Sequence, residues 1–497
     1  MLQNPQLHYL DNAATTIVAP EVADVIDKAM REHWANPSSL YGPGARSEEA
    51  LNAARAAVAR TLGCKSRELY FTSCGSESNN LALLGAVQTR TFGKGIVVSG
   101  FEHPSVQRPL ERLAKQGYDV TVVAPRADGM LDIDAMLERV DKNTILVACM
   151  MVNNEIGTRN DVERLAAEVK RRNSRTIVHV DAVQAWMRVP IKLDNIDTLS
   201  VSGHKIHAPK GIGALYLSDR LVQAFQPPYL GGEQERQMRP GTENLPYAMG
   251  LAAAATRLAK TMKSRDTAMR ALNRQLREGL KAFPEVVINS PENAVPEVLN
   301  FSEMCIKSET MLAFLAEEQI YVSSASACGR GQPSHTLAAM GRDPLAIDTA
   351  IRVSFCADNT PEDVDAFLNV LAPQFKGVYF VSLDQDTLRY LYIPLYFEEV
   401  LTEAKGLFSK ALLLYAARFV KSEFYHLFEE VCDYSQLKWK LSGGTTPKFV
   451  YQKKDGEWLS VRILRYKDYA QGKRETLWIF ENMVQPDPGD FYDSTET

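Results

Sequence analysis

The sequence is poor in the features that mark secreted, membrane-spanning or nucleic-acid-coating proteins. Its seven cysteines are scattered, odd in number and never paired as C-x-x-C, which fits a reducing cytosol. The N-terminus has no basic segment followed by an apolar one, and no apolar run approaches the length that crosses a bilayer. The formal charge of -5 argues against a surface that coats nucleic acid. We therefore expect a cytoplasmic protein with no membrane or direct nucleic-acid partner, and no metal site.

What remains is the composition of an ordinary globular protein. Hydrophobic residues make up 45% and charged residues 24% of the 497 positions. This length predicts two or three domains. The chain contains no internal repeat.

Short β-branched runs alternate with helical stretches through the first half of the chain. The expected strands are residues 68–72, 95–99, 120–124, 144–148 and 176–181, and the expected helices include 77–87 and 162–171. This alternation predicts an α/β domain with a mostly parallel sheet that helices cover on both faces. In such sheets, ligands bind beyond the carboxyl ends of the strands.

The second half predicts a smaller domain and then an extension. A long helical stretch over 252–281 leads to expected strands at 297–301, 320–323 and 350–354, and to a helix over 361–371. After Pro373 the composition changes and becomes rich in aromatic and β-branched residues.

The extension itself has a mixed pattern. Residues 398–431 are amphipathic and helical, 449–463 predict a hairpin that turns at Asp455-Gly456, and 476–480 predict a last strand. The hairpin and last strand resemble the end of a PAS-type sensor domain, although an accessory module that packs on the core or binds a partner fits as well. The acidic tail 485–497 is expected to be disordered.

Two charged residues at expected strand ends carry the chemistry. Lys205, in Ser202-Gly-His-Lys, is placed to form a Schiff base with an aldehyde cofactor. Asp181, at the end of the preceding strand, is suited to pair with a protonated pyridine nitrogen. For either residue alone, a solvated lysine or a helix-capping aspartate is the better reading. The two together favour pyridoxal 5'-phosphate (PLP).

The segment Thr72-Ser-Cys-Gly-Ser-Glu-Ser-Asn79 joins an expected strand to an expected helix. Backbone N–H groups at a helix N-terminus bind anions, Gly75 permits close approach of the backbone, and the Ser76 hydroxyl adds a donor. A phosphate fits there. A simple helix N-cap explains the segment equally well.

The chain resembles the cysteine desulfurases, in the class-V aminotransferase branch of PLP fold type I, from Tyr9 to about Leu371. The segments that carry the resemblance are Tyr9-Leu-Asp-Asn-Ala-Ala-Thr-Thr16, Asn36-Pro-Ser-Ser39, Glu102-His103, Val152-Asn-Asn-Glu-Ile-Gly157, Arg239-Pro-Gly-Thr242 and Ser323-Ser-Ala-Ser-Ala-Cys328. It implies a large domain over about 16–255 with a mostly parallel seven-stranded sheet, and a small domain from about 1–15 and 256–375. Residues 376–497 lie beyond the family's usual end.

The resemblance also implies how PLP is bound. Lys205 would carry the cofactor, Asp181 would bind its ring nitrogen, and His103 would stack on the ring and relay protons. The residues expected near the phenolic oxygen are Gln184 and Asn154. Those expected to hold the phosphate are Gly75, Ser76, Ser202 and His204.

Further roles concern the substrate and a second subunit. Asn154 would also lie close to L-cysteine, and Arg352 would clamp its carboxylate, a bidentate task that suits a guanidinium. Thr242 would reach the phosphate of the partner subunit, which implies a homodimer with shared sites.

Cys328 is the expected nucleophile. It lies in Ser323-Ser-Ala-Ser-Ala-Cys-Gly-Arg-Gly331, where small residues suit a mobile loop and Arg330 would favour the thiolate. Cys74 is the nearest competitor and is expected to be a packing residue. The implied reaction converts L-cysteine to L-alanine and leaves a persulfide on Cys328, from which a sulfur-acceptor or scaffold protein takes the sulfur.

Three other activities fit parts of the same pattern. A selenocysteine lyase uses the same site, and an aminotransferase of the same fold would not need Cys328. A degenerate desulfurase that acts as a scaffold or sensor is disfavoured because all the expected site residues are present. The acceptor stays open among iron–sulfur cluster assembly, tRNA thiolation and thio-cofactor supply.

Overall fold

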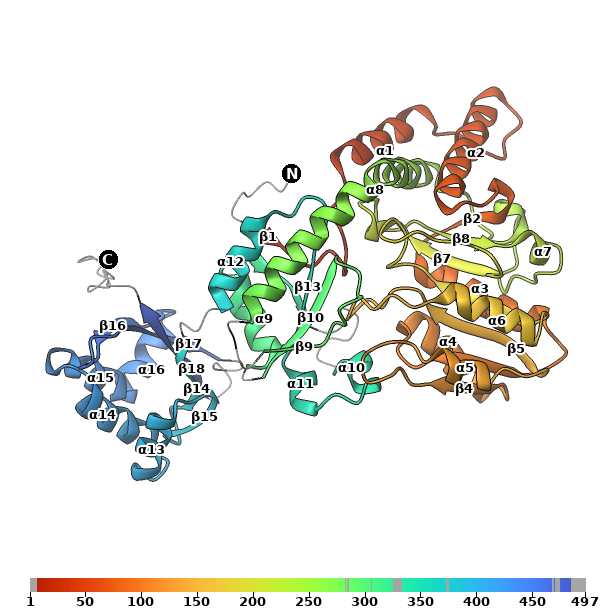
Figure 1. Ribbon diagram of the computed structural model, residues 1–497. Coiled ribbons are helices and arrows are strands. Elements are labelled where there is room, and N and C mark those ends of the chain that lie inside the picture. Colours follow the sequence, from red (N-terminus) through yellow and green to blue (C-terminus); the bar gives the residue numbers. More distant parts are fainter. Residues whose placement is uncertain are drawn as a thin grey trace. The chain divides into compact units, whose positions relative to one another are not determined.

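The computed structural model describes residues 7–281, 283, 286–304, 306–324, 333–371, 375–466, 469 and 474–483 (Figure 1). The chain divides into two compact units. Unit 1 is Met1–Ala282, Val286–Met304 and Ser308–Ala366, and unit 2 is Phe283–Glu285, Cys305–Lys307 and Phe367–Thr497. The division falls inside helix α12 (Pro361–Leu371), near the boundary expected at about residue 375.

A seven-stranded sheet forms the centre of unit 1. Its strands, in spatial order, are β2 (Leu69–Thr72), β8 (Gly213–Leu217), β7 (Thr198–Ser202), β6 (Ile177–Asp181), β5 (Thr144–Met150), β3 (Gly95–Ser99) and β4 (Asp119–Val123). β8 runs antiparallel to β2 and β7, and the other neighbouring pairs are parallel. The predicted mostly parallel sheet is therefore confirmed. Every residue of β5, β6 and β7 is buried, as expected for apolar strands covered on both faces.

The direction of the strands sets the position of the site. Because β2 and β7 are both antiparallel to β8, they point the same way as each other and as β6. Thr72, Asp181 and Ser202, the last residues of these strands, therefore meet at one edge of the sheet.

Helices α3 and α6 lie beside this sheet in Figure 1. The helices of unit 1 are α1 (Pro20–Glu32), α2 (Gly42–Leu62), α3 (Gly75–Thr89), α4 (Pro104–Lys115), α5 (Ile133–Glu138), α6 (Val162–Arg172), α7 (Asp219–Val222), α8 (Leu245–Leu280), α9 (Ser308–Glu317), α10 (His335–Ala339) and α11 (Pro344–Asp348). The long helix α8 begins earlier than the predicted residue 252, because Asn244 caps it by accepting from Tyr247 N and Pro246 occupies its first turn.

Two smaller sheets complete unit 1. A four-stranded antiparallel sheet contains β12 (Ser323–Ser324), β13 (Ala350–Ser354), β10 (Val298–Glu303) and β9 (Val286–Ile288). The short strands β1 (His8–Tyr9) and β11 (Ile320–Tyr321) form a parallel pair. A bridge between Asp11 and Ser354 brings the start of the chain beside β13.

Unit 2 is built around a five-stranded antiparallel sheet. Its strands, in spatial order, are β15 (Thr387–Tyr392), β14 (Phe375–Ser382), β18 (Glu475–Met483), β17 (Trp458–Arg465) and β16 (Lys448–Gln452). The predicted hairpin is confirmed, since β16 pairs with β17 across a turn in which Gly456 has φ +97°. The helices α13 (Leu395–Glu403), α14 (Phe408–Phe419), α15 (Tyr425–Cys432) and α16 (Tyr434–Ser442) connect β15 to β16.

The helical character predicted over 398–431 is confirmed, but it is divided among α13, α14 and α15. The first division occurs where Lys405 and Gly406 take left-handed φ angles of 56° and 78°. The aromatic residues pack into a core of their own, in which Tyr379 stacks on Phe397 with ring centroids 5.1 Å apart. Within the described residues, no helix is long and apolar enough to cross a membrane. The predicted tail 485–497 lies outside those residues.

Candidate active site

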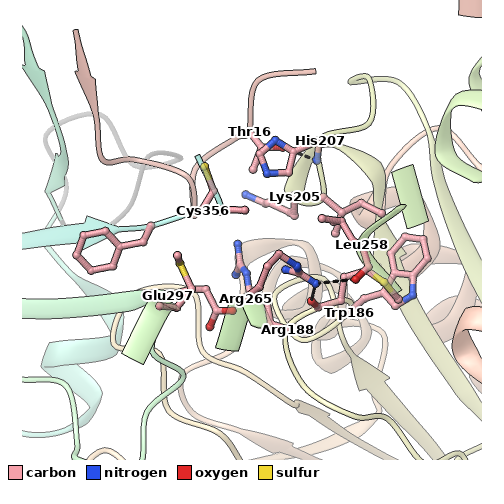
Figure 2. Close-up of a pocket in the computed structure, with 14 residues that line it drawn as sticks. Thr16, Trp186, Arg188, Lys205, His207, Leu258, Arg265, Glu297 and Cys356 are labelled. Carbon is pink, nitrogen blue, oxygen red and sulfur yellow. Dashed lines mark hydrogen bonds between the residues drawn. The ribbon is translucent and has the colours of Figure 1, made fainter. Parts of the chain in front are cut away.

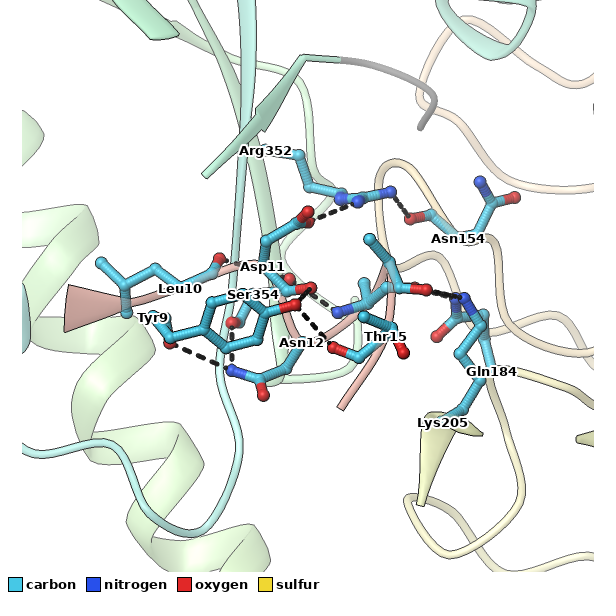
Figure 3. Close-up of polar contacts among 12 residues, drawn as sticks. Tyr9, Leu10, Asp11, Asn12, Thr15, Asn154, Gln184, Lys205, Arg352 and Ser354 are labelled. Atoms are coloured by element: carbon cyan, nitrogen blue, oxygen red, sulfur yellow. Dashed lines mark hydrogen bonds and ion pairs between the residues drawn. The ribbon is translucent and has the colours of Figure 1, made fainter. Parts of the chain in front are cut away.

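Lys205 lies directly after β7, in the 3-10 turn Gly203–Lys205, and its side chain points to the N-terminal segment of the chain. Its Nζ donates to the carbonyl oxygens of Ala13 and Ala14, each at 2.7 Å (Figure 3). Gln184 Nε2 donates to the same Ala13 oxygen at 2.9 Å. The amine is therefore held by two neutral acceptors, next to the Gln184 amide, which is predicted to lie near the cofactor's phenolic oxygen.

Gln184 is itself oriented by a cation. Arg188 donates from Nη1 to Gln184 Oε1, so the amide must present its NH₂ group toward Ala13. Burial lowers the pKa of Arg188, and the nearby Glu297 opposes that shift. Arg188 was not among the predicted site residues, because it lies four positions after Gln184 in a turn that the sequence pattern did not predict.

Asp181 is 5% exposed and accepts two hydrogen bonds. Asn79 donates from Nδ2 to Oδ2 at 2.7 Å, and the Val183 backbone N–H donates to Oδ1 at 2.9 Å. Both bonds hold the carboxylate at the carboxyl end of β6 as an acceptor for a protonated ring nitrogen.

His103 is the N-cap of α4 and is held by Ser105. The Ser105 backbone N–H donates to His103 Nδ1 at 3.1 Å, and Ser105 Oγ lies 2.7 Å from the same nitrogen. Burial lowers the pKa of His103, the charge of Asp181 raises it, and that of Lys205 lowers it further. The ring is therefore electrostatically linked to both predicted PLP-binding residues.

A set of donors fit for a phosphate lies at the N-terminus of α3. The first N–H groups of a helix lack intrahelical acceptors, and Gly75 and Ser76 begin this one. Ser202 is 2% exposed, and its Oγ has no hydrogen-bond partner among the described residues. A Cβ on Gly75 would lie 2.6 Å from Val183 Cγ2 and 3.4 Å from Ser202 Cβ, so only glycine leaves this cradle open.

His204 lies at the same edge of the sheet. Its Nδ1 is 3.2 Å from Thr15 Oγ1, and burial, aided by the charges of Lys205 and Lys210, lowers its pKa to about 4. A neutral imidazole at neutral pH provides one N–H donor for an anion.

Arg352 belongs to β13 and is 1% exposed. Its Nη2 donates to Asp11 Oδ1 at 2.7 Å, and its Nη1 donates to the Asn154 carbonyl oxygen at 2.9 Å. Its Nε has no hydrogen-bond partner among the described residues. Figure 3 shows that the backbone of residues 11–14 links this guanidinium to Lys205. The carboxylate of Asp11, which sequence reasoning passed over although it lies in the matching segment 9–16, is thus part of the site.

A small cavity lies behind Lys205 (Figure 2). Charged and sulfur-containing side chains line it, among them Arg188, Arg265, Glu297 and Cys356. Burial raises the pKa of Glu297, which the nearby Arg188 opposes, and burial raises the pKa of the Cys356 thiol to about 12. Cys356 is therefore held as an unreactive thiol close to the active lysine.

Two of the predicted residues are not brought into this group. Cys328, with its neighbour Arg330, lies outside the described residues, although Ser323 of β12 pairs with Arg352 where the chain enters that segment. Thr242 is exposed on a loop of unit 1, as expected for a residue that would act on another subunit. Cys74, the competing thiol, is half-buried at the N-cap of α3.

The residues at the sheet edge fit PLP. The site combines an amine on Lys205, a buried acceptor on Asp181 and an unsatisfied buried hydroxyl on Ser202 beside a helix N-terminus. These are the groups that a pyridine aldehyde with a phosphate needs: a carbonyl-reactive amine, a partner for the ring nitrogen, and anion donors.

Comparison with known proteins agrees with this chemistry. The family Aminotransferase class-V matches residues 8–367. The cysteine desulfurase of Trichormus azollae is 38% identical over 376 residues, covering 73% of this chain and 91% of that protein. The cysteine desulfurase IscS of Methanosarcina thermophila is 38% identical over 369 residues, covering 73% and 90%.

Solved structures lead to the same family. The structure of a NifS-like protein is 35% identical and has a TM-score of 0.69, covering 73% of this chain and 97% of that chain. DndA from Streptomyces lividans is 36% identical with a TM-score of 0.60, covering 70% and 99%. The chain therefore belongs to the class-V aminotransferases and, within that family, to the PLP-dependent cysteine desulfurases.

Proposed function

We propose that this chain removes sulfur from L-cysteine, releasing L-alanine and leaving a persulfide on Cys328. The observation that supports this most is that Asp181 ends β6 and Lys205 lies in the turn that follows the adjacent strand β7. With Arg352, whose partner Asp11 lies two residues before the Ala13 carbonyl that Lys205 contacts, they provide an amine, a ring-nitrogen acceptor and a carboxylate-binding cation.

Different residues of the site would bind different parts of PLP. Lys205, Asp181 and His103 would hold and cover PLP, Gln184 and Asn154 would lie near its phenolic oxygen, and Gly75, Ser76, Ser202 and His204 would hold its phosphate. When bound, PLP supplies an electron sink for the charge left at the substrate α-carbon.

The protein residues perform the other steps. Arg352 would bind the substrate carboxylate through its Nε and the second hydrogen of Nη2, since its remaining bonds go to Asp11 and Asn154. Lys205 Nζ would accept the α-proton. The Cys328 thiolate would attack the substrate sulfur, so that the Cβ–S bond breaks and a new S–S bond forms. Protonation of the remaining carbon skeleton yields L-alanine.

Turnover of the purified holoenzyme tests this activity directly. Alanine and sulfide in equal amounts, formed from L-cysteine with a reductant and no keto acid, are the expected result. A requirement for a keto-acid acceptor would instead indicate an aminotransferase. Rates on L-cysteine and L-selenocysteine, compared in the same preparation, distinguish a desulfurase from a selenocysteine lyase.

We propose a cytoplasmic homodimer in which Thr242 of each subunit reaches the other subunit's phosphate. The exposure of Thr242 on its loop supports this arrangement. Light scattering of the holoenzyme should give twice the mass of the chain. Sulfur would then pass from Cys328 to an acceptor or scaffold protein for iron–sulfur cluster assembly, tRNA thiolation or a thio-cofactor.

Unit 2 is proposed to be an accessory module of PAS type. Its five antiparallel strands, with all four helices inserted between β15 and β16, support a compact module with its own core. Limited proteolysis of the holoenzyme should cut between the family-like part and this module before either is degraded. A uniform pattern of cuts across both would argue against a separate module.

A further inference from the structure

Asn79 is the centre of a hydrogen-bond network that joins two predicted site residues, Asp181 and His103. The side chain is 0% exposed in α3. Its Nδ2 donates to Asp181 Oδ2 at 2.7 Å and to Ser105 Oγ at 2.8 Å, while its Oδ1 lies 3.0 Å from His179 Nε2. Ser105 Oγ in turn lies 2.7 Å from His103 Nδ1. The network thus runs from the ring-nitrogen acceptor to the stacking histidine.

The far end of the network sets the orientation of the Asn79 amide. Burial lowers the pKa of His179 to about 3, so this imidazole is neutral at physiological pH and has one N–H. Its Nδ1 lies 2.9 Å from Thr198 Oγ1. When the Thr198 hydroxyl donates to His179 Nδ1, the proton of His179 is on Nε2 and is donated to Asn79 Oδ1. The two hydrogens of Asn79 Nδ2 then point toward Asp181 and Ser105.

The donors and acceptors at the near end favour one arrangement of protons. Asn79 uses its two N–H bonds on Asp181 and Ser105. Because Ser105 Oγ accepts from Asn79, its own hydrogen is available for His103 Nδ1. The Ser105 backbone N–H also donates to this nitrogen, at 3.1 Å. Two donors therefore face Nδ1, which disfavours a proton there.

We propose that Asn79 and Ser105 are positioning residues that hold His103 as the neutral tautomer with its proton on Nε2, while Asn79 ties that tautomer to the Asp181 carboxylate. The proposal rests on the proposed place of His103 beside PLP. It gives the histidine a defined direction for proton relay, since Nε2 is the only nitrogen that then carries a hydrogen.

The charged groups around His103 shift its pKa in opposite directions. Asp181 on β6 favours the imidazolium, whereas Lys205 and burial disfavour it, and His204 lies in the same electrostatic neighbourhood. The two donors at Nδ1 also disfavour the imidazolium form of His103, because protonation of Nδ1 would place a third hydrogen between them.

Nuclear magnetic resonance of holoenzyme labelled with ¹⁵N-histidine tests the proposal without relying on activity. The chain has eight histidines, and the His103→Gln variant assigns the signal. Wild-type His103 should show the Nε2–H tautomer above its pKa. Ser105→Ala should raise the pKa of His103 by about one unit, the value of one lost hydrogen bond. Asn79→Ala, which adds no charge, should raise the pKa in the same direction, and the rise in the double variant should be smaller than the sum of the two single rises.

Two controls separate positioning from a structural role. Ser302→Ala removes another buried hydroxyl that accepts from one side chain and donates to one carbonyl. It should leave the pKa and the tautomer of His103 unchanged. Ser105→Thr keeps the hydroxyl and should restore the wild-type titration. An Nδ1–H tautomer in the wild type, or an unchanged pKa in a folded Ser105→Ala enzyme, would overturn the proposal. Because these signals report hydrogen bonds, they remain interpretable even if the enzyme proves inactive on L-cysteine.

Discussion

Arg352 and Asp11 form an ion pair of 2.7 Å in which the side chains are 2% and 18% exposed. The pair places a carboxylate on the same guanidinium that we assign to the substrate. Since Arg352 Nε has no partner among the described residues, the guanidinium can donate to a second carboxylate while it keeps its bond to Asp11.

Arg352→Lys should therefore raise KM for L-cysteine by about tenfold to a hundredfold, because a lysine cannot replace the bidentate bond. Steady-state kinetics on the PLP-loaded enzyme measures this. Asp11→Asn is the matched control, because it keeps an acceptor oxygen at position 11 and leaves the Arg352 guanidinium in place. It should change KM far less. A larger effect from Asp11→Asn would mean that the ion pair, and not the substrate, is the main role of Arg352.

Ser202→Ala should destabilise the PLP-bound form of the protein but not the form without PLP. Without PLP, loss of a buried hydroxyl that lacks a partner should leave the melting temperature unchanged or raise it. With PLP, loss of a donor to the phosphate should weaken cofactor binding by about tenfold. Thermal unfolding with and without PLP gives both values, and a destabilised apoprotein would contradict the assignment.

Glu102→Gln should change how stability depends on pH. Burial raises the pKa of Glu102 to about 8 from 4.5, partly opposed by its bond from Ser99. The folded state then holds a proton that the unfolded chain releases. The contribution of Glu102 to stability is therefore complete below pH 4.5 and lost as pH rises through 8, at up to about 1.4 kcal/mol per pH unit.

The melting temperature of Glu102→Gln, measured relative to wild type, should accordingly rise between pH 5 and pH 9. Glu111→Gln, at a side chain that is 54% exposed, should follow the wild-type curve. Parallel curves for all three proteins would show that Glu102 does not hold a proton in the folded state.

The sequence was sufficient to predict the parts of the site that follow strand ends. Asp181 ends one strand and Lys205 lies three residues beyond the end of the next, and parallel strands bring such ends together whatever the details of packing. The partners of these residues were not predictable, because Asn79 lies 102 positions from Asp181 and no local pattern relates them. The break at Lys405 and Gly406 was missed for a different reason: the helical pattern continues on both sides of it, although a glycine is a common local signal for the end of a helix.

The central claim is that Cys328 takes the substrate sulfur. The most direct measurement is a single turnover of PLP-loaded enzyme with L-cysteine and no reductant, followed by mass spectrometry of the peptide that contains Cys328. We predict that this peptide gains one sulfur atom as one alanine is released. Cys328→Ala should retain the visible PLP band and form no alanine, while Cys74→Ala should behave as wild type. Undiminished alanine from Cys328→Ala, or the added sulfur on Cys74, would contradict the account.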